Sequence, residues 1–413
     1  MRLVFHVDVN SAFLSWEATR RVANGEPDLR EIPSAIAGDR EARRGVILAK
    51  SVPAKAYGIT TGEPLAAALR KCPGLVTAPP DFALYVRMSR AFVEICEKYA
   101  PVVEKFSIDE CFLDMTGTER VYPDPVETAH KIKDEIRDTL GFTVNIGIGE
   151  NKLCAKMASD FTKPDRVHTL FSEEIAAKMW PLPVDELFTV GEATAARLRR
   201  AGISTIGALA AVDEGTLSGI FGEKTGRHLW RYANGIDDAP VSAEREEAKG
   251  YSNSTTLPED VTDYAAADAV LLALADSTAM RLRADEAKAW CVSVQIRTGD
   301  FVNRSHQRKL AAPTDITAEI YQVSAALLRE LWNGKTPLRL LGVTLTDIDR
   351  QGTEQLTLFP DAARERGKRL DAAVDAVRRQ FGSDAIRFGG AVTGVAKKHR
   401  AKMDMEKESE GRP

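Results

Sequence analysis

The stretch VVEKFSIDECFLD, residues 102–114, places two adjacent carboxylates, Asp109 and Glu110, inside an apolar run that is typical of a buried β-strand. Burying two unpaired carboxylates is costly in free energy. In a regular strand they would also point to opposite faces, so a tight turn or bulge is needed to aim both at one place. A hard divalent cation such as Mg²⁺ would offset their repulsion, because it takes oxygen ligands from a few carboxylates.

A third carboxylate, Asp8, lies in a short apolar strand expected near the N-terminus. In that strand His6, Asp8 and Asn10 would share one face. Taken alone, Asp8 is better explained as a strand-end residue that caps the following helix. Together with the pair at 109–110 it suits a two-metal site, which leaves polymerase, nuclease and cyclase chemistry open.

Length and composition indicate a soluble, multidomain globular protein. The chain has 413 residues, of which 44% are apolar and 28% charged, so two to four domains are expected. The formal net charge of −4 argues weakly against nucleic-acid binding, although local charge decides. Without a secretory signal or an apolar run of membrane-spanning length, we expect a cytoplasmic protein. The five cysteines form no CxxC pair, and buried free thiols are expected.

The spacing of apolar residues predicts an α+β organisation. The elements expected in the first half are a helix over 82–99, strands over 101–114 and 142–149, and a helix over about 126–139. Residues 168–235 are expected to be all helical, and residues 236–249, polar and rich in Glu, predict a linker. Residues 250–349 predict a separate domain with the order strand, helix, strand, strand, helix, strand. One more helix is expected over 364–381.

Two motifs resemble those of the Y family of DNA polymerases. The stretch HVDVNSAF, residues 6–13, is similar to the family's first catalytic motif, and SIDE, residues 107–110, matches a second one letter for letter. Either match alone carries a false-positive risk, but both occur in order. The resemblance implies error-prone synthesis past damaged bases, with primer–template DNA, dNTPs and two Mg²⁺ ions. The metal ligands that it implies are Asp8, the Val9 carbonyl, Asp109 and Glu110.

The resemblance also implies residues of a nucleotide pocket. Phe13 lies where the family places its steric gate, an aromatic ring that would clash with a ribose 2′-OH. For this residue alone, a core Phe at the start of a helix would be the better reading. Ala49, Val52 and Lys55 stand where the family usually has Thr, Tyr and Arg, so weak or altered nucleotide binding is a real possibility.

A second lysine is implied for the triphosphate. The segment NKLCAKMASDFTKP is similar to the family's NKxxAKxASDxxKP, and Lys163 within it is the implied triphosphate contact. Lys152 and Lys156 lie at i and i+4 of the expected helix. They are as consistent with a solvated helix face as with DNA contacts.

DNA contacts are implied in two later regions. Residues 187–209 resemble a helix–hairpin–helix in which Gly191 offers backbone N–H groups to a phosphate. Arg297, Arg304 and Arg308 lie on two expected strands, where cations on one sheet face would suit a phosphate cradle.

A docking peptide is expected near the C-terminus. Gln355, Leu356, Leu358 and Phe359 belong to QLTLF, which matches the peptide that binds bacterial sliding clamps. Apolar side chains exposed in a polar stretch favour docking, and the alternative is a strand or helix end packed on the last domain.

The implied fold is multidomain α+β. Its parts are a ferredoxin-like palm at 1–19 and 80–166, fingers at 20–79, a helical thumb with the helix–hairpin–helix at 167–235, a linker at 236–249, a little finger at 250–349, and a tail at 350–413 with the clamp peptide and one helix. The main alternative is a polymerase-like adaptor that binds DNA and the clamp without synthesis. Such adaptors lose their carboxylates, whereas all three remain here. A bacterial monomer, associated with the nucleoid when on DNA, is the default expectation.

Overall fold

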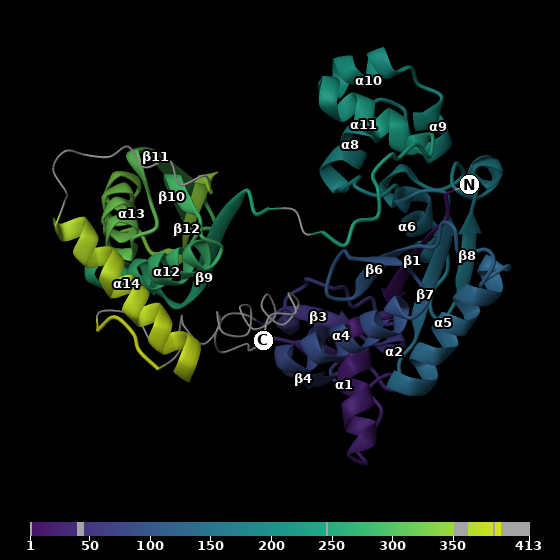
Figure 1. Ribbon diagram of the computed structural model, residues 1–413, viewed down its shortest axis with the longest axis horizontal. Helices are drawn as coiled ribbons and strands as arrows, with labels where there is room; N and C mark the ends of the chain where they lie inside the picture. Colours follow the sequence, from purple (N-terminus) through teal and green to yellow (C-terminus); the bar gives the residue numbers. More distant parts are fainter. Residues whose placement is uncertain (1, 39–44, 245–246, 351–361, 383–384, 390–413) are drawn as a thin grey trace. The chain divides into compact units, whose positions relative to one another are not determined.

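The computed structural model describes residues 2–38, 45–244, 247–350, 362–382 and 385–389. It divides into two compact units, one comprising Met1–Ala37 and Ile47–Arg245 and the other built mainly on Glu246–Pro413 (Figure 1). All five cysteines are buried and free, as predicted. No helix in the described ranges is long and apolar enough to cross a membrane.

A five-stranded sheet with the order β5-β6-β1-β7-β8 organises the first unit. Its strands are β1 (Val4–Val9), β5 (Val102–Lys105), β6 (Glu110–Asp114), β7 (Val144–Gly149) and β8 (Val167–Leu170). With α4 (Phe82–Glu97) and α5 (Pro125–Leu140), the first four strands follow the order βαββαβ, and all their neighbouring pairs are antiparallel. This strand order is that of a ferredoxin-like fold, so the predicted palm topology is confirmed.

Strand β1 is buried along its whole length because it lies in the middle of this sheet. Phe5, Val7 and Val9 pack in a core shared with α4 and α5. The opposite face of the strand contacts α6 (Lys152–Asp160). The alternation that places Asp8 on the face away from the valines is therefore present as predicted.

Strand β8 corrects the expectation that residues 168–235 are all helical. It pairs in parallel with β7, with Ile146 opposite Val167 and Gly149 opposite Leu170. A four-residue strand is too short for its periodicity to distinguish it from a helix. It forms because the free edge of β7 offers backbone hydrogen bonds from a distant part of the chain.

A smaller lobe is inserted between β1 and α4, built on a three-stranded sheet with the order β3-β2-β4. Its elements are α1 (Ala12–Ala23), β2 (Ser34–Ala37), β3 (Ile47–Lys50), α2 (Val52–Lys55), α3 (Leu65–Lys71) and β4 (Val76–Ala78). Leu14 and Ala18 of α1 pack on Ile36 and Ala49, which attaches the lobe directly to the end of β1.

The chain after β8 forms a bundle of short helices. They are η1 (Ser172–Glu174), α7 (Ile175–Lys178), η2 (Val184–Glu186), α8 (Glu192–Arg200), α9 (Ile206–Ala210), α10 (Glu214–Phe221) and α11 (Glu223–Ala233). Gly226 lets α11 lie against α10, because a Cβ at this position would meet the backbone of Leu217 and Ser218 at 2.5 Å or less. The bundle packs in an apolar core that includes Leu198 and Leu209 and that it shares with α6.

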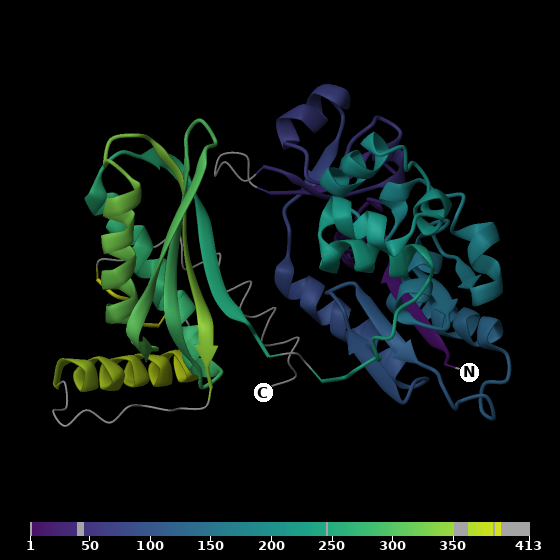
Figure 2. The same ribbon diagram turned by 90° about the horizontal axis from the view of Figure 1, so that it is seen from above.

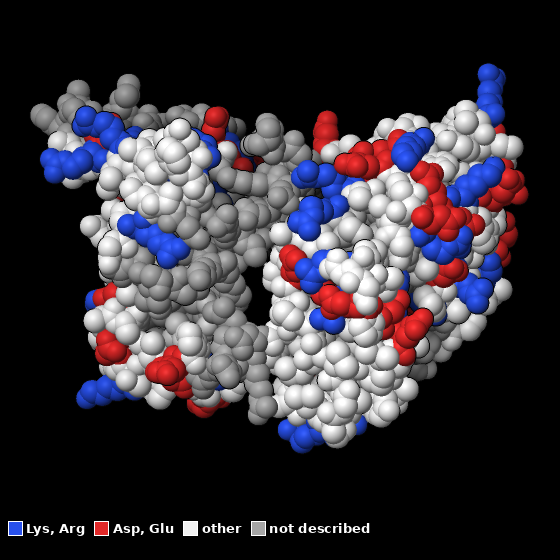
Figure 3. All heavy atoms as spheres, turned by 90° about the horizontal axis from the view of Figure 1, so that it is seen from below, with Lys and Arg blue, Asp and Glu red and all other residues white. Residues whose placement is uncertain are grey.

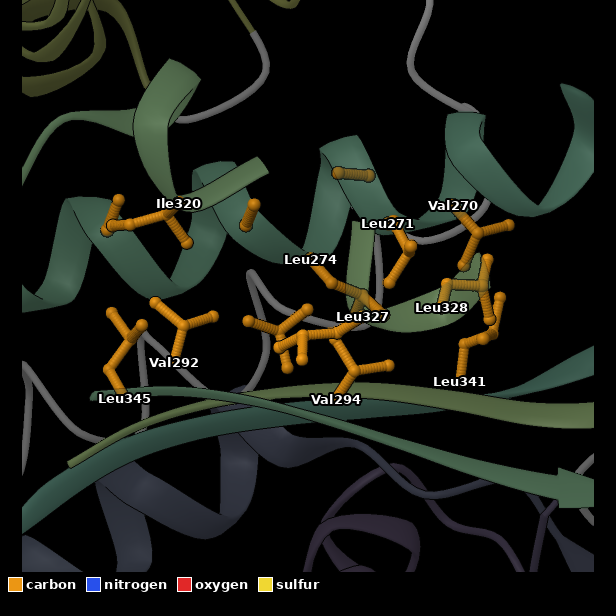
Figure 4. Packing of buried hydrophobic residues seen from close by; sticks show 14 of the residues in the cluster. Val270, Leu271, Leu274, Val292, Val294, Ile320, Leu327, Leu328, Leu341 and Leu345 are labelled. Atoms are coloured by element: carbon orange, nitrogen blue, oxygen red, sulfur yellow. The ribbon is translucent and has the colours of Figure 1, made fainter. Parts of the chain in front are cut away.

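The second unit is an antiparallel sheet with the order β11-β10-β12-β9, covered on one face by two helices. The elements are β9 (Gly250–Val261), α12 (Tyr264–Ala284), β10 (Lys288–Thr298), β11 (Asn303–Thr314), α13 (Thr317–Leu331) and β12 (Leu338–Asp349). Figure 4 shows Leu271, Leu274 and Leu327 of the helices lying over Val292 and Val294 of the sheet. The predicted order of strands and helices is confirmed.

A buried ion cluster fixes α14 (Ala362–Phe381) to the second unit, where Figure 2 shows the helix crossing one end of the helix layer. Arg283 of α12 binds Asp375 through Nε at 2.7 Å and Asp371 through Nη1 at 3.3 Å. Asp371 also accepts a hydrogen bond from the backbone N–H of Thr317 at 2.8 Å. It thereby satisfies one of the N–H groups that the start of α13 leaves unpaired.

We predict that Asp371→Ala loosens α14. The change leaves Arg283 short of one buried carboxylate and removes the acceptor at the start of α13, at a cost of about 3 kcal/mol. Amide hydrogen exchange in α13 and α14 should then accelerate roughly 100-fold. Glu365→Ala, a control on the same helix whose side chain is 52% exposed, should have little effect. Unchanged protection in Asp371→Ala would show that the cluster does not hold the helix.

Candidate active site

Asp8 and Glu110 lie directly opposite each other on β1 and β6. Asp109 immediately precedes Glu110 and lies in the turn between β5 and β6, where the N–H groups of Phe106 and Ser107 both donate to the Glu110 carbonyl at 3.0 and 3.1 Å. The Asp109 carbonyl accepts from the N–H of the residue after Asp8 at 3.0 Å. This is the turn that the sequence required, and it brings the adjacent carboxylates to one end of the sheet.

Two lysines lie among these carboxylates. Lys156 of α6, only 8% exposed, places Nζ 3.3 Å from Asp8 Oδ2 and 3.2 Å from Glu110 Oε2. Lys163 in the loop after α6 places Nζ 2.8 Å from Asp8 Oδ1. Both lysines also bind Asp160, at 3.4 and 2.8 Å. Lys156 is therefore part of the site, a role that its spacing in the sequence did not reveal.

The side chain of His6 contacts Glu110 and helps to orient it. Its ring is fully buried, and burial lowers its pKa. Nε2 lies 3.2 Å from Glu110 Oε2 and Nδ1 lies 2.8 Å from Ser159 Oγ. With Nε2 protonated, Nε2–H donates to the carboxylate, while the Ser159 hydroxyl beside Nδ1 donates to the Lys156 carbonyl at 2.8 Å. Glu110 is thus oriented by a side chain on the same face of β1 as Asp8.

The two adjacent carboxylates have opposite pKa shifts. Burial raises the pKa of Asp109, and the negative charge of Glu110 raises it further, although Ser107 Oγ donates to it at 2.6 Å. Burial also disfavours the ionised form of Glu110, but the hydrogen bond from His6 and the positive charge of Lys156 outweigh it and lower its pKa to about 2. Lys156 therefore compensates the charge of Glu110, whereas no cation of the described residues pairs with Asp109.

The two lysines compensate the negative charge of the carboxylates. Among the described residues, no group of three His, Cys, Asp or Glu side chains is arranged to hold a metal ion as it stands. Lys156 and Lys163 instead supply the positive charge that Asp8 and Glu110 need when buried. The carboxylate oxygens at this end of the sheet are of the kind that a hard cation takes as ligands.

Phe13 lies at the start of α1 in an aromatic group. Its ring stacks on Tyr85 with centroids 4.5 Å apart and planes at 11°. Its edge-on neighbour is Phe82, and the ring also packs on the small cluster that contains Ala49. The surroundings fit both a core residue and a ring that is held rigidly at the start of α1.

The smaller lobe has few free polar side chains near residues 51–55, where the sequence predicted contacts with the triphosphate. Val52 is 66% exposed at the start of α2, and Lys55 is exposed at its end. Ser51 is buried and fully used, because its hydroxyl donates to Ile32 and accepts from the N–H groups of Ser34 and Ala54. In the described part of the chain, Lys55 makes no contact with the three carboxylates, unlike Lys163.

The predicted hairpin of the helix–hairpin–helix is present before α8. Gly191 is the N-cap of α8, and a Cβ there would meet nothing within 4 Å, so its backbone faces open space. Thr189 adopts a φ of +76°, which is unfavourable for a β-branched residue. Its hydroxyl lies 2.8 Å from His228 Nε2 of α11, a contact that supports this backbone conformation.

The arginines of the second unit do not share a face, which corrects the expected phosphate cradle. Arg304 and Arg308 of β11 lie opposite Ile296 and Val292, whose side chains are buried on the helix-covered face. Arg297 belongs to the other face, because neighbouring residues of a strand alternate. The register of the β10–β11 pair determines which face of the sheet each arginine occupies, and this register cannot be read from the sequence.

Charge is also dispersed on the surface. Arg308 is paired with Glu330 of α13. On the face of the first unit drawn in Figure 3, Lys and Arg side chains are interspersed with Asp and Glu. The residues predicted to bind the clamp, Gln355, Leu356, Leu358 and Phe359, lie outside the described residues.

Comparison with known proteins assigns the family. Residues 7–160 match the impB/mucB/samB family, residues 248–358 match its C-terminal domain, and residues 185–237 match the thumb domain of DNA polymerase-iota. Among solved structures, a Y-family DNA polymerase chimera aligns with a TM-score of 0.72 and 24% identity, over 84% of this chain and 99% of that one. This match supports the fold.

Named relatives are similar over nearly their whole length. DNA polymerase IV of Clostridium acetobutylicum is 44% identical over 388 residues, which are 93% of this chain and 97% of that protein. DNA polymerase IV of Clostridium kluyveri is 36% identical over 95% of this chain and 98% of its own length. DNA polymerase IV 1 of Bacillus subtilis is 36% identical over 95% and 93%. The chain, as its two catalytic motifs indicated, belongs to the Y family of DNA polymerases.

Proposed function

We propose that this chain is a DNA-directed DNA polymerase that copies past damaged template bases. The reaction transfers a nucleotide from a dNTP to a primer 3′-OH. The observation that carries this proposal is the meeting of Asp8, Asp109 and Glu110 with Lys163 at one end of the palm sheet. Nucleotidyl transfer depends mainly on positioning and on compensating phosphate charge, and this group offers both metal ligands and a cation.

The carboxylates fit Mg²⁺. They supply oxygen ligands, and burial and repulsion raise the pKa of Asp109, a condition that a nearby cation relieves. Asp8, the Val9 carbonyl, Asp109 and Glu110 are the proposed ligands of two ions. When bound, such ions lower the pKa of the primer hydroxyl and neutralise the leaving pyrophosphate.

The remaining site residues act on the nucleotide. Lys163, which now neutralises Asp8, is proposed to bind the triphosphate, with Lys55 contributing from the smaller lobe. Phe13 is proposed to exclude a ribose 2′-OH, because stacking on Tyr85 keeps its ring from moving aside.

Partners follow from the remaining motifs. Backbone N–H groups at Gly191 are proposed to bind a DNA phosphate, and Arg297 to bind the backbone from the open face of its sheet. The peptide at 355–359 is proposed to bind the sliding clamp. An adaptor without synthesis is the competing function, favoured by the exposed Val52 where the family usually has Tyr.

Primer extension by the full chain tests the proposal. With a primed template, dNTPs and Mg²⁺, the wild type should extend the primer, and Asp8→Asn should be at least roughly 1,000-fold slower because a metal ligand is lost. Asp138→Asn is the control, since Asp138 is 67% exposed on α5 and pairs with Arg137 rather than with a residue of the site. No extension by the wild type, with DNA and clamp binding retained, would favour the adaptor.

Metal binding can be measured without activity. In the absence of divalent ions, Asp109→Asn should melt at a higher temperature than the wild type, because it removes a partly buried charge that is repelled by Glu110 and Asp8. Mg²⁺ at about 100 times its dissociation constant should stabilise the wild type by about 2.7 kcal/mol, and the variant much less. Equal stabilisation of both proteins by Mg²⁺ would remove Asp109 from the ligand set.

Sugar selection tests Phe13. Phe13→Ala should raise incorporation of ribonucleotides relative to deoxyribonucleotides by roughly 10- to 100-fold, because the ring that meets the 2′-OH is gone. Phe82→Ala removes another ring of the same aromatic group and should leave the ratio unchanged. Similar ratios in both variants would assign Phe13 to the core alone.

A further inference from the structure

Two buried amides, Asn10 and Asn145, hold the loop that carries Lys163. Asn10 follows β1 and is 8% exposed, and Asn145 lies in β7 and is fully buried. Asn10 Nδ2 donates to Asn145 Oδ1 at 3.1 Å. The pair therefore links the strand that bears Asp8 to the neighbouring strand, next to the carboxylates.

The outer hydrogen bonds of the pair run mostly to the Lys163 loop. Asn10 Oδ1 accepts from the backbone N–H of Asp165 at 3.0 Å, and Asn145 Oδ1 accepts from that of Arg166 at 3.2 Å. Asn145 Nδ2 donates to the Thr162 carbonyl at 2.7 Å. The loop is thus held on both sides of Lys163 by two side chains.

Two further bonds fix the amides themselves. Thr143 Oγ1 donates to Asn10 Oδ1 at 2.9 Å, and Asn145 Nδ2 donates to the Ser159 carbonyl at 3.0 Å. The backbone N–H and carbonyl partners determine which end of each amide is oxygen and which is nitrogen. The Asn10 NH₂ group must therefore face Asn145 Oδ1. A carboxylate at position 10 would place an oxygen there, against another acceptor.

We propose that Asn10, through Asn145, is a positioning residue for the incoming nucleotide. It holds the 162–166 loop so that Lys163 Nζ stays at the carboxylates, 2.8 Å from Asp8, where the triphosphate arrives. The inference rests on the proposed triphosphate contact of Lys163. It explains why Asn occupies position 10: the site needs one donor and one acceptor at this position, and an amide supplies both.

Two variants of the full chain test the role of Asn10. Asn10→Asp keeps the size and the acceptor and removes the donor, so its fold should be retained. Asn10→Ala is neutral and excludes an effect of added charge. Each should lower kcat/KM for the dNTP about ten-fold through a higher KM, while primer–template affinity stays unchanged. Asn333→Asp is the matched control, because only Oδ1 of Asn333 is used, by the N–H groups of Lys335 and Thr336.

Combination with Lys163→Ala separates positioning from a general structural role. If Asn10 acts through Lys163, Lys163→Ala alone should lower kcat/KM for the dNTP, and adding Asn10→Ala should lower it no further. Equal losses in both backgrounds, or a loss with Asn10→Asp only, would overturn the inference. If Lys163→Ala itself leaves kcat/KM unchanged, the proposed triphosphate contact fails instead. Melting temperatures of all variants identify any that unfold.

Discussion

Three carboxylates at one end of a buried strand need nearby positive charge, and much of the first unit is arranged around this constraint. Asp8 is 7% exposed and cannot rely on water, so Lys156 must come close. It can do so because β7 carries Gly147 and Gly149 beneath α6. A Cβ at Gly147 would lie 2.0 Å from the carbonyl of Ala155, and one at Gly149 would lie 2.8 Å or less from α6. Because these two glycines have no side chain, α6 lies close enough to the sheet for Lys156 to reach the carboxylates.

The two units show why element order alone does not determine a sheet. Both follow the order βαββαβ, yet the first strand is central in one sheet and at the edge in the other. Burial reports how each sheet is covered, and not where a strand lies within it. The residues of β1 are buried on both faces, whereas Tyr251, Asn253 and Thr255 of β9 alternate with more exposed neighbours, as residues of the central strand β10 also do. Neither the succession of helices and strands nor the burial pattern of one strand therefore determines the position of that strand in the sheet.

The sequence predicted which carboxylates come together better than it predicted the structure that supports them. Asp109 and Glu110 could be identified because adjacent carboxylates in an apolar run have few structural explanations. Lys156 could not, since a lysine four residues from another fits any helix face until the packing of that helix is known. The same limit applies to Arg304 and Arg308. Their strands were predicted, but a register cannot be read from one sequence, and a shift of one residue exchanges the two faces.

The residues at which the smaller lobe differs from the family pattern are consistent with the rest of the site. Ala49 is 8% exposed and packs in the cluster beneath Phe13, so its side chain serves the core and offers nothing to a phosphate. Val52 is apolar as well. Of the three positions at which the family usually binds the triphosphate, only position 55 carries a polar side chain here, that of Lys55. Lys163, by contrast, lies on a loop held by the buried amides of Asn10 and Asn145. Under the proposed function, recognition of the triphosphate therefore rests more on Lys163 at the edge of the palm, which also binds Asp8, than on the smaller lobe.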